Sequence, residues 1–236
     1  MNNLHRQLNI KVRKEIEMLL SHKIHPKIHK DTDGVWVFSG PGTFFEPLDK
    51  GQKPWMQWMD RYRILYGATI VREVTAKRLH KQSQDVTRTD ILGYGPVLIY
   101  NGTHKENQAL RLALKSALSI IPYEKVIIID KVKGANNQFR EIKNTKDQIL
   151  SLPKDIAGSG KKIQKRIALV SNSAHIERIL RYLEKYKPIP EYIKVEVFPL
   201  KLPKKDKEVE IKEELNKIWK YFQKGDLSWF PFPVEE

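Results

Sequence analysis

The sequence predicts an α/β protein with a Rossmann-like, doubly wound, mostly parallel sheet of about five strands and extra N- and C-terminal helices. Three observations lead to this prediction. Short apolar runs alternate with stretches of helical periodicity along the chain. The runs are apolar throughout, as in strands that are buried on both faces. Each run stops at glycine, proline or small polar residues. Apolar strands separated by helices are typical of a parallel sheet covered on both sides.

The first 33 residues are expected to form an amphipathic helix and a tail. Apolar side chains recur there at helical spacing, at Leu4, Leu8, Val12 and Ile16. The tail holds His22, His25 and His29, but Pro26 interrupts the helical face that they would share. No metal site is therefore expected at these histidines.

Residues 34–200 are expected to form the α/β domain. Its five strands are predicted at 34–38, 96–100, 125–129, 166–170 and 192–198, with helices at 105–120 and from 176 onward. The last strand mixes Lys194 and Glu196 with apolar residues, which is expected of a sheet edge. Ligands of such sheets bind at the carboxyl ends of the strands.

Residues 201–236 are expected to form a linker, an amphipathic helix at 209–222 and an aromatic tail. The tail, Trp229–Pro233, contains three aromatic residues. We expect it to pack back on the domain; the alternative is that it docks on a partner.

Composition excludes several classes of protein. The 236 residues contain no cysteine, which excludes disulfides, thiolate catalysis and cysteine-ligated metal centres. No segment approaches the roughly 18 apolar residues of a membrane span, and the N-terminus lacks an apolar signal core. We therefore expect a soluble, cytoplasmic protein, as a monomer or a homodimer.

The net charge of +15 is unevenly distributed. Residues 131–166 contain ten basic and three acidic side chains and contribute +7 of it. Such a segment attracts anions, but a solvated lysine-rich loop has the same composition. Nucleic-acid binding is an alternative, although Phe139 is the only aromatic residue there and binding of single strands normally uses several. We interpret the segment as a basic wall or flap beside an anion site.

A glycine turn follows the first predicted strand. Glycines let backbone N–H groups approach a phosphate or carboxylate, and the turn adds two hydroxyls. The candidate ligand-binding residues are Ser39, Gly40, Gly42 and Thr43. The turn is neither a Gly-x-Gly-x-x-Gly fingerprint nor a Walker loop, so ordinary NAD enzymes and P-loop ATPases are disfavoured.

The second predicted strand ends at Asn101-Gly102, and the next helix begins shortly after it. The free N–H groups of a first helical turn favour anions, which makes Asn101 and Gly102 candidates. Glu106 is a candidate as well, but Thr103 and Glu106 also have the spacing of a capping box.

The most informative motif is Val170-Ser171-Asn172-Ser173-Ala174-His175-Ile176-Glu177-Arg178. It combines a strand end, a hydroxyl-rich turn and a helix start, and it puts His175 and Arg178 on one helical face. Both side chains could reach a ligand at the carboxyl edge of the sheet. The alternative is that Ser171 or Ser173 caps the helix and His175 only packs.

This motif resembles the hallmark of the YdcF/SanA/ElyC-like family (domain of unknown function 218), Val-Thr-Ser-x-x-His-Met-x-Arg. Other segments follow in the family's order and extend the resemblance over residues 33–200. Val35 to Gly42 is similar to the first strand and its turn, and Arg63 or Arg61 to an arginine-led helix. Asn101-Gly102 and Glu106 resemble the Ser-Gly turn and its glutamate. Asn144-Thr145 is similar to the start of an Asn-Thr-x-Glu-Asn motif, with Asn136 as a rival position.

The resemblance implies a polar pocket at the strand ends and a ligand such as S-adenosylmethionine or another nucleotide. We expect the domain to bind a small anionic or nucleotide-type ligand, with group transfer or hydrolysis as the reaction classes. The turns at Ser39–Thr43 and Ser171–Ser173 would donate hydrogen bonds, Arg63 and Arg178 would neutralise charge, and His175 would be the acid or base. Glu106 would hold a ribose hydroxyl or a metal.

Two alternatives belong to other functional classes. One is a non-enzymatic nucleic-acid-binding protein that uses residues 131–166. The other is a partner-binding module that uses the C-terminal helix and the aromatic tail.

Overall fold

The computed structural model describes residues 3–20, 26–39, 61–115, 118, 120–134, 136–152, 163–200 and 207–234. Its centre is a five-stranded sheet with the order β3-β2-β1-β6-β7. All four pairs of neighbouring strands are parallel. The strands are β1 (Thr32–Val37), β2 (Val97–Tyr100), β3 (Val126–Ile128), β6 (Arg166–Asn172) and β7 (Lys194–Leu200). The predicted α/β class with a parallel sheet is confirmed.

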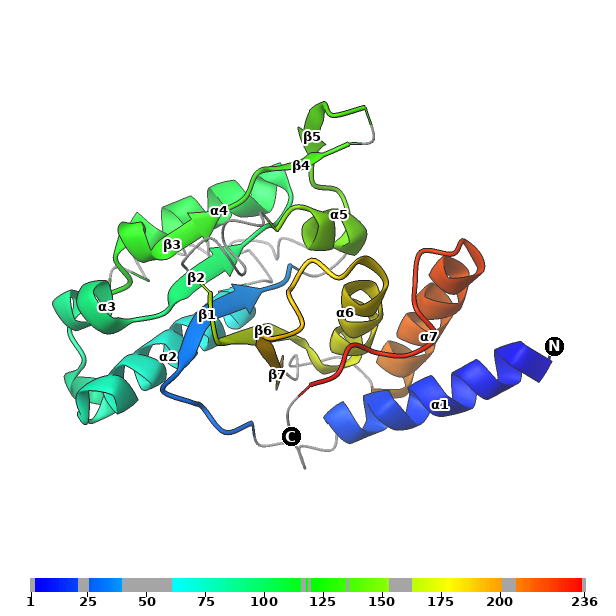
Figure 1. The fold of residues 1–236 in the computed structure, drawn as a ribbon, viewed down its shortest axis with the longest axis horizontal. Coiled ribbons are helices and arrows are strands. Elements are labelled where there is room, and N and C mark those ends of the chain that lie inside the picture. Colours follow the sequence, from blue (N-terminus) through cyan, green and yellow to red (C-terminus); the bar gives the residue numbers. More distant parts are fainter. Residues whose placement is uncertain are drawn as a thin grey trace, which may run out of the picture.

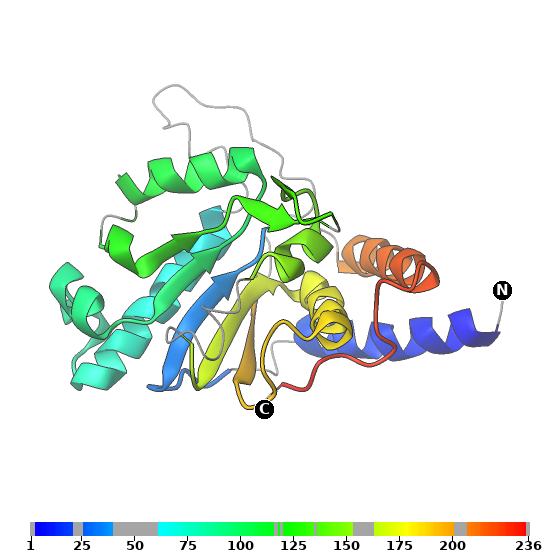
Figure 2. The ribbon, with the colours of Figure 1, turned by 45° about the horizontal axis from the view of Figure 1, so that its top comes forward.

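Helices cover both faces of this sheet, as Figures 1 and 2 show. On one face α2 (Arg61–Leu79), α3 (Arg88–Tyr94) and α4 (His104–Lys115) share a core with Val35, Leu98 and Val170. On the other face α5 (Thr145–Leu150) and α6 (Ser173–Tyr186) share a core with Trp36 and Leu169. Successive residues of a strand point to opposite faces, so uninterrupted apolar strands supply both cores.

Strand order reverses direction at β1. The chain first runs outward from β1 to β2 and β3, and it then returns to place β6 on the other side of β1. The carboxyl ends of β1 and β6 therefore flank a topological switch point, where the helical connections leave toward opposite faces. Open α/β sheets bind their ligands at such points.

The basic segment of the sequence begins with a short antiparallel hairpin. Its strands are β4 (Lys131–Lys133) and β5 (Phe139–Glu141), and they form a separate two-stranded sheet. Figure 1 shows this hairpin standing out beyond α5, clear of the main sheet. The hairpin and α3 were not predicted from the sequence.

The terminal helices are α1 (Asn3–Leu20) and α7 (Lys207–Gln223), and both add to the face that α6 covers. His5 of α1 stacks on Trp219 of α7, with 4.0 Å between the ring centroids. None of the helices in the described residues is long and apolar enough to cross a membrane.

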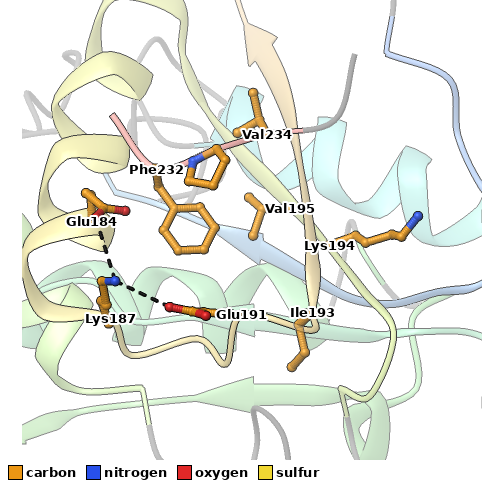
Figure 3. Close-up of a pocket in the computed structure, with 9 residues that line it drawn as sticks. Glu184, Lys187, Glu191, Ile193, Lys194, Val195, Phe232 and Val234 are labelled. Atoms are coloured by element: carbon orange, nitrogen blue, oxygen red, sulfur yellow. Dashed lines mark hydrogen bonds and ion pairs between the residues drawn. The ribbon is translucent and has the colours of Figure 1, made fainter. Parts of the chain in front are cut away.

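The C-terminal segment that includes the aromatic tail contacts the domain. Leu227 and Phe232 are buried, and the Phe232 backbone N–H donates to the Leu180 carbonyl at 3.1 Å. Phe232 and Val234 also line a pocket of about 420 Å³ with Val195, shown in Figure 3. Val195 lies near the start of β7, so this pocket is at the opposite end of the sheet from the switch point.

Candidate functional site

His175 is the centre of a buried hydrogen-bond cluster at the switch point. It lies in the first turn of α6 and is 2% exposed. Its Nδ1 lies 3.0 Å from the Ser171 hydroxyl, and its Nε2 lies 3.0 Å from the Thr145 hydroxyl. Three predicted site residues from β6, α6 and α5 are therefore in direct contact.

The hydrogen-bond roles of His175 depend on its tautomer. Arg178 Nη1 donates to Thr145 Oγ1 at 3.2 Å, and the threonine hydroxyl keeps its own hydrogen and a second lone pair for the Nε2 atom of His175. In the tautomer with the ring proton on Nδ1, facing Ser171, Nε2 accepts the hydrogen of the Thr145 hydroxyl. Burial lowers the pKa of His175 well below its usual range, and Arg178, Arg63 and Lys217 add to this effect. The imidazole is therefore neutral at pH 7.

The arrangement around Thr145 suits proton transfer. The Nε2 atom of His175, which is unprotonated in the Nδ1–H tautomer, and the Arg178 guanidinium both contact the Thr145 hydroxyl. A base that accepts the proton and a cation that stabilises the resulting oxygen are the two parts that activate a hydroxyl. The cluster can therefore act chemically as well as structurally.

Arg178 is held by α7, which the sequence placed outside the α/β domain. Its Nε and Nη2 donate to the two carboxylate oxygens of Glu214 at 2.8 and 3.2 Å. Burial alone would raise the pKa of Glu214, but the charges and hydrogen bonds of Arg178 and Lys217 together outweigh it and leave that pKa below its usual range. Arg178 thus uses its donors on Glu214 and Thr145. Its geometry is that of a group that positions Thr145.

Arg63 approaches the switch point from the first turn of α2. The side chain is buried, and its Nε donates to the Asn172 amide oxygen at 2.7 Å. Burial lowers the pKa of Arg63 to about 10, against the raising influence of Tyr100 and of nearby carboxylates including Glu106. The guanidinium therefore stays cationic at neutral pH.

The start of α6 has no side-chain cap. Asn172 is the N-cap residue, but its side chain makes no capping hydrogen bond and instead accepts from Arg63. The Ser173 hydroxyl is completely buried and has no hydrogen-bond partner among the residues that the structure describes. The alternative that Ser171 or Ser173 caps this helix is therefore wrong. The first backbone N–H groups of α6 make no hydrogen bond to the side chain of the N-cap residue.

Ser39 connects the carboxyl end of β1 to the neighbouring elements. Its hydroxyl accepts a hydrogen bond from the Gln148 amide of α5 and also bonds to Tyr100. Asn101, at the end of β2, accepts from Trp36 Nε1 at 3.0 Å and donates to the Gln148 carbonyl at 2.6 Å. The ends of β1 and β2 are thereby tied to α5.

Gly102 and Glu106 satisfy the backbone at the start of α4. The Gly102 N–H donates to the Asn107 side chain at 3.0 Å, and the Thr103 N–H donates to the Glu106 carboxylate at 2.6 Å. Glu106 therefore makes its half of the capping box. Its charge also acts on Arg63, so the carboxylate remains part of the electrostatics of the switch point.

The structure distinguishes between the two pairs of rival positions. Arg63 contacts Asn172, whereas Arg61 lies against Tyr62. Asn144 caps α5 through the Asp147 N–H and so presents Thr145 to His175, whereas Asn136 bonds to Gln138 in the hairpin turn. Gly40, Gly42 and Thr43 lie outside the described residues.

Sequence reasoning did not select Gln148, Glu214 or Trp36. Glu214 had a signal: together with Glu210 it shares the face of α7 that carries the buried Ile211 and Ile218. Acidic side chains at that spacing on an apolar face require a cationic partner. Within the described residues, no group of three or more histidine, aspartate or glutamate side chains is placed to hold a metal ion.

Comparisons of the chain with protein-family models, with curated proteins and with solved structures found no match. The candidate site therefore depends on its own geometry and on the sequence motifs that lead to it.

Proposed function

We propose that the chain is a YdcF-like domain that binds a small anionic or nucleotide-type ligand at the switch point between β1 and β6. The main support is the start of α6. There the side chain of the N-cap residue, Asn172, accepts a hydrogen bond from Arg63 and does not cap the helix. The adjacent Ser173 hydroxyl is buried with no hydrogen-bond partner among the described residues. An uncapped helix N-terminus with a hydroxyl and a guanidinium beside it has the donors that a phosphate or carboxylate requires.

The proposed chemistry is group transfer or hydrolysis on that ligand, with His175 as the base. In the tautomer with the ring proton on Nδ1, its Nε2 accepts the hydrogen of the Thr145 hydroxyl. The imidazole is neutral at pH 7, and an anion bound beside it would raise its lowered pKa toward the range in which it acts as a base. S-adenosylmethionine and other nucleotides remain the ligands that the family resemblance implies.

The test begins with native mass spectrometry of the purified protein to detect a bound molecule, followed by titration calorimetry with inorganic phosphate, ATP and S-adenosylmethionine. Ser173→Ala should lower the affinity for the probe that binds by about 10- to 100-fold, since a hydrogen bond to a charged group contributes about 1.5–3 kcal/mol. The variant should fold, because in the unliganded protein its hydroxyl has no partner to lose.

Ser228→Ala is the matched control, because the Ser228 carbonyl contacts Arg181, about two turns further along α6. Its affinity should equal that of the wild type. If no molecule copurifies and none of the three probes binds, or if Ser173→Ala binds as tightly as the wild type, this ligand site is wrong.

Nucleic-acid binding through residues 131–166 is the alternative function. Three of the cations in that segment already pair with carboxylates: Arg140 with Asp147, Lys146 with Asp226, and Arg166 with Glu196. Binding of single-stranded RNA or DNA with an affinity that falls steeply with salt would favour this alternative.

A further inference from the structure

We propose that a second pocket, between the carboxyl end of β3 and the β4–β5 hairpin, binds a small planar aromatic anion. We call it the hairpin pocket. It has a volume of about 650 Å³, which lies within the range of small-molecule sites. It is separate from the start of α6, so the proposal goes beyond the function argued above.

The floor of the hairpin pocket is apolar. Ile127 and Ile129 come from the exposed edge of the sheet at β3, and Leu150 and Leu152 come from the end of α5. A floor of branched aliphatic side chains favours a flat apolar group over a hydrated one. This part of the pocket selects the aromatic portion of the ligand.

The rim of the hairpin pocket is formed by the hairpin. Lys133 and Phe139 are directly opposite each other in the β4–β5 ladder, and both line the pocket. Phe139 is 68% exposed, so its ring is accessible to a ligand that enters the pocket. An aromatic ligand could stack on this ring while an anionic group attached to it reaches the Lys133 ammonium.

The charge at the rim is positive. Lys131 has Glu141 opposite it on the ladder, but Lys133 has Phe139 opposite, and it pairs with none of the acidic side chains in the described part of the chain. The carboxylate that lines the pocket, Asp130, already accepts from Arg111 at 2.6 Å and from Asn107 at 2.9 Å. An anion is therefore complementary to the unpaired lysine.

The hairpin is anchored firmly enough to present a preformed rim. On its other face Val132 is buried, and Arg140 donates to both carboxylate oxygens of Asp147 at 2.7 and 2.5 Å. Asp147 lies in α5, the helix that also carries Thr145. A bidentate arginine–carboxylate pair fixes orientation as well as distance. The same helix therefore bounds both the hairpin pocket and the His175 cluster.

A shared hydrogen-bond chain links the two sites. Ser151, a lining residue of the hairpin pocket, accepts from Asn101 at 3.0 Å and donates to the Gln148 carbonyl at 2.9 Å. Gln148 in turn donates to Ser39 at the switch point. A ligand with a ring in the hairpin pocket would lie beside the residues that hold the ends of β1 and β2.

The experiment measures binding of 1-naphthyl phosphate by titration calorimetry, with inorganic phosphate as the probe that lacks the ring. Phe139→Ala should weaken binding of 1-naphthyl phosphate about 5- to 30-fold and leave binding of phosphate unchanged, as expected for the loss of one stacking contact. Lys133→Gln should weaken binding several-fold and reduce its dependence on salt.

Tyr192→Ala is the matched control, because Tyr192 is an aromatic residue of similar exposure, 64%, in the loop before β7. It should bind like the wild type. All three altered side chains are exposed, so their thermal unfolding midpoints should agree with that of the wild type.

The proposal is overturned if Phe139→Ala binds 1-naphthyl phosphate as tightly as the wild type, or if Tyr192→Ala weakens binding equally. The Ser173→Ala variant separates this result from the proposed function. Weaker binding in Ser173→Ala alone places the probe at α6 and rejects the hairpin pocket. Weaker binding in Phe139→Ala, together with wild-type binding in Tyr192→Ala, supports the pocket whatever the behaviour of Ser173→Ala.

Discussion

At the scale of single residues, the burial of His175 has a measurable consequence for stability. The unfolded chain takes up a proton on this imidazole near its ordinary pKa of about 6.5, whereas the folded protein resists it because that pKa is lowered. Folding stability contributed by His175 is therefore fully present above pH 6.5 and is lost as the pH falls below it, by at most about 1.4 kcal/mol per pH unit.

His175→Gln should remove this component. Urea unfolding at pH 5, 6 and 7 should show that the wild type loses more stability toward pH 5 than the variant does. His80→Asn is the control, because His80 is exposed and asparagine tolerates its left-handed backbone, with φ of 55°. If the pH profiles of the wild type and His175→Gln run parallel, the imidazole is not held neutral by the fold.

Most of the predicted site residues in the described part of the chain lie together at the carboxyl ends of the strands. Several of them bond to protein groups that the sequence did not predict as their partners. The motif predicts that His175 and Arg178 share a face, and both contact Thr145. The sequence could not show that Glu214 would be the ion-pair partner of Arg178, because Glu214 is 36 positions away and lies in a helix outside the family resemblance. Local spacing predicts which residues share a face, whereas the partner on the facing element depends on how the helices pack.

At the scale of secondary-structure elements, α2 packs closely on β1 at Gly67. A Cβ atom at Gly67 of α2 would lie 2.6 Å from Val37 Cγ2 and 3.3 Å from Leu98 Cδ1. Gly67→Ala gains up to about 1 kcal/mol of helix propensity, but overpacking a filled core costs about 1–3 kcal/mol. We expect net destabilisation of about 1–2 kcal/mol, measured by urea unfolding.

Gly93→Ala in α3 provides the matched control, because an added Cβ there meets no atom within 4 Å. It should be neutral or stabilise the fold by about 0.4–1 kcal/mol. If both substitutions changed the free energy of unfolding by the same amount, α2 would not pack closely on β1 at Gly67.

The five strands were predictable because four are apolar runs that end at turn residues, and the fifth, β7, mixes apolar residues with Lys194 and Glu196 as expected of a sheet edge. The β4–β5 hairpin was not, because its three-residue strands, Lys-Val-Lys and Phe-Arg-Glu, are too short and too polar to show periodicity. Helix α3 had an overlooked signal, since Thr87 and Asp90 form a capping box before a seven-residue helix. Short elements of this kind are stabilised by caps and by ion pairs such as that of Arg140 with Asp147, and only slightly by patterns of apolar residues.

At the scale of the whole molecule, the terminal segments converge on Arg181. This completely buried guanidinium donates to Glu15 of α1 at 2.7 Å and to the carbonyls of Ser228 and Trp229 in the tail, and it lies 3.0 Å from Glu177. Both ends of the chain are therefore attached to α6, which also carries His175. The sequence predicted that the tail packs back, but it did not indicate a buried cluster of charges as the point of attachment.

Glu177 makes this attachment dependent on pH. Burial and a hydrogen bond with Glu15 raise the pKa of Glu177 to about 8, although Arg181 acts in the opposite direction. In the unfolded chain the same carboxyl group releases its proton near its ordinary pKa of about 4.3. Between these two values the folded state holds more protons than the unfolded state, so the contribution of Glu177 to stability decreases as the pH rises toward 8.

Glu177→Gln keeps the shape of the protonated carboxyl group and cannot ionise. We expect this variant to match the wild type near pH 5 and to exceed its free energy of unfolding increasingly from pH 6.5 to 8.5, with a difference on the order of 1–3 kcal/mol at the upper end. Urea unfolding at half-unit pH steps measures the difference, and Glu184→Gln on the more exposed part of α6 is the control. His175 does not affect the comparison, because it is present in both proteins and its contribution cancels in the difference. A constant difference across that pH interval would show that Glu177 ionises at its ordinary pKa, and α1 and the tail would then be held on α6 by a fully charged cluster.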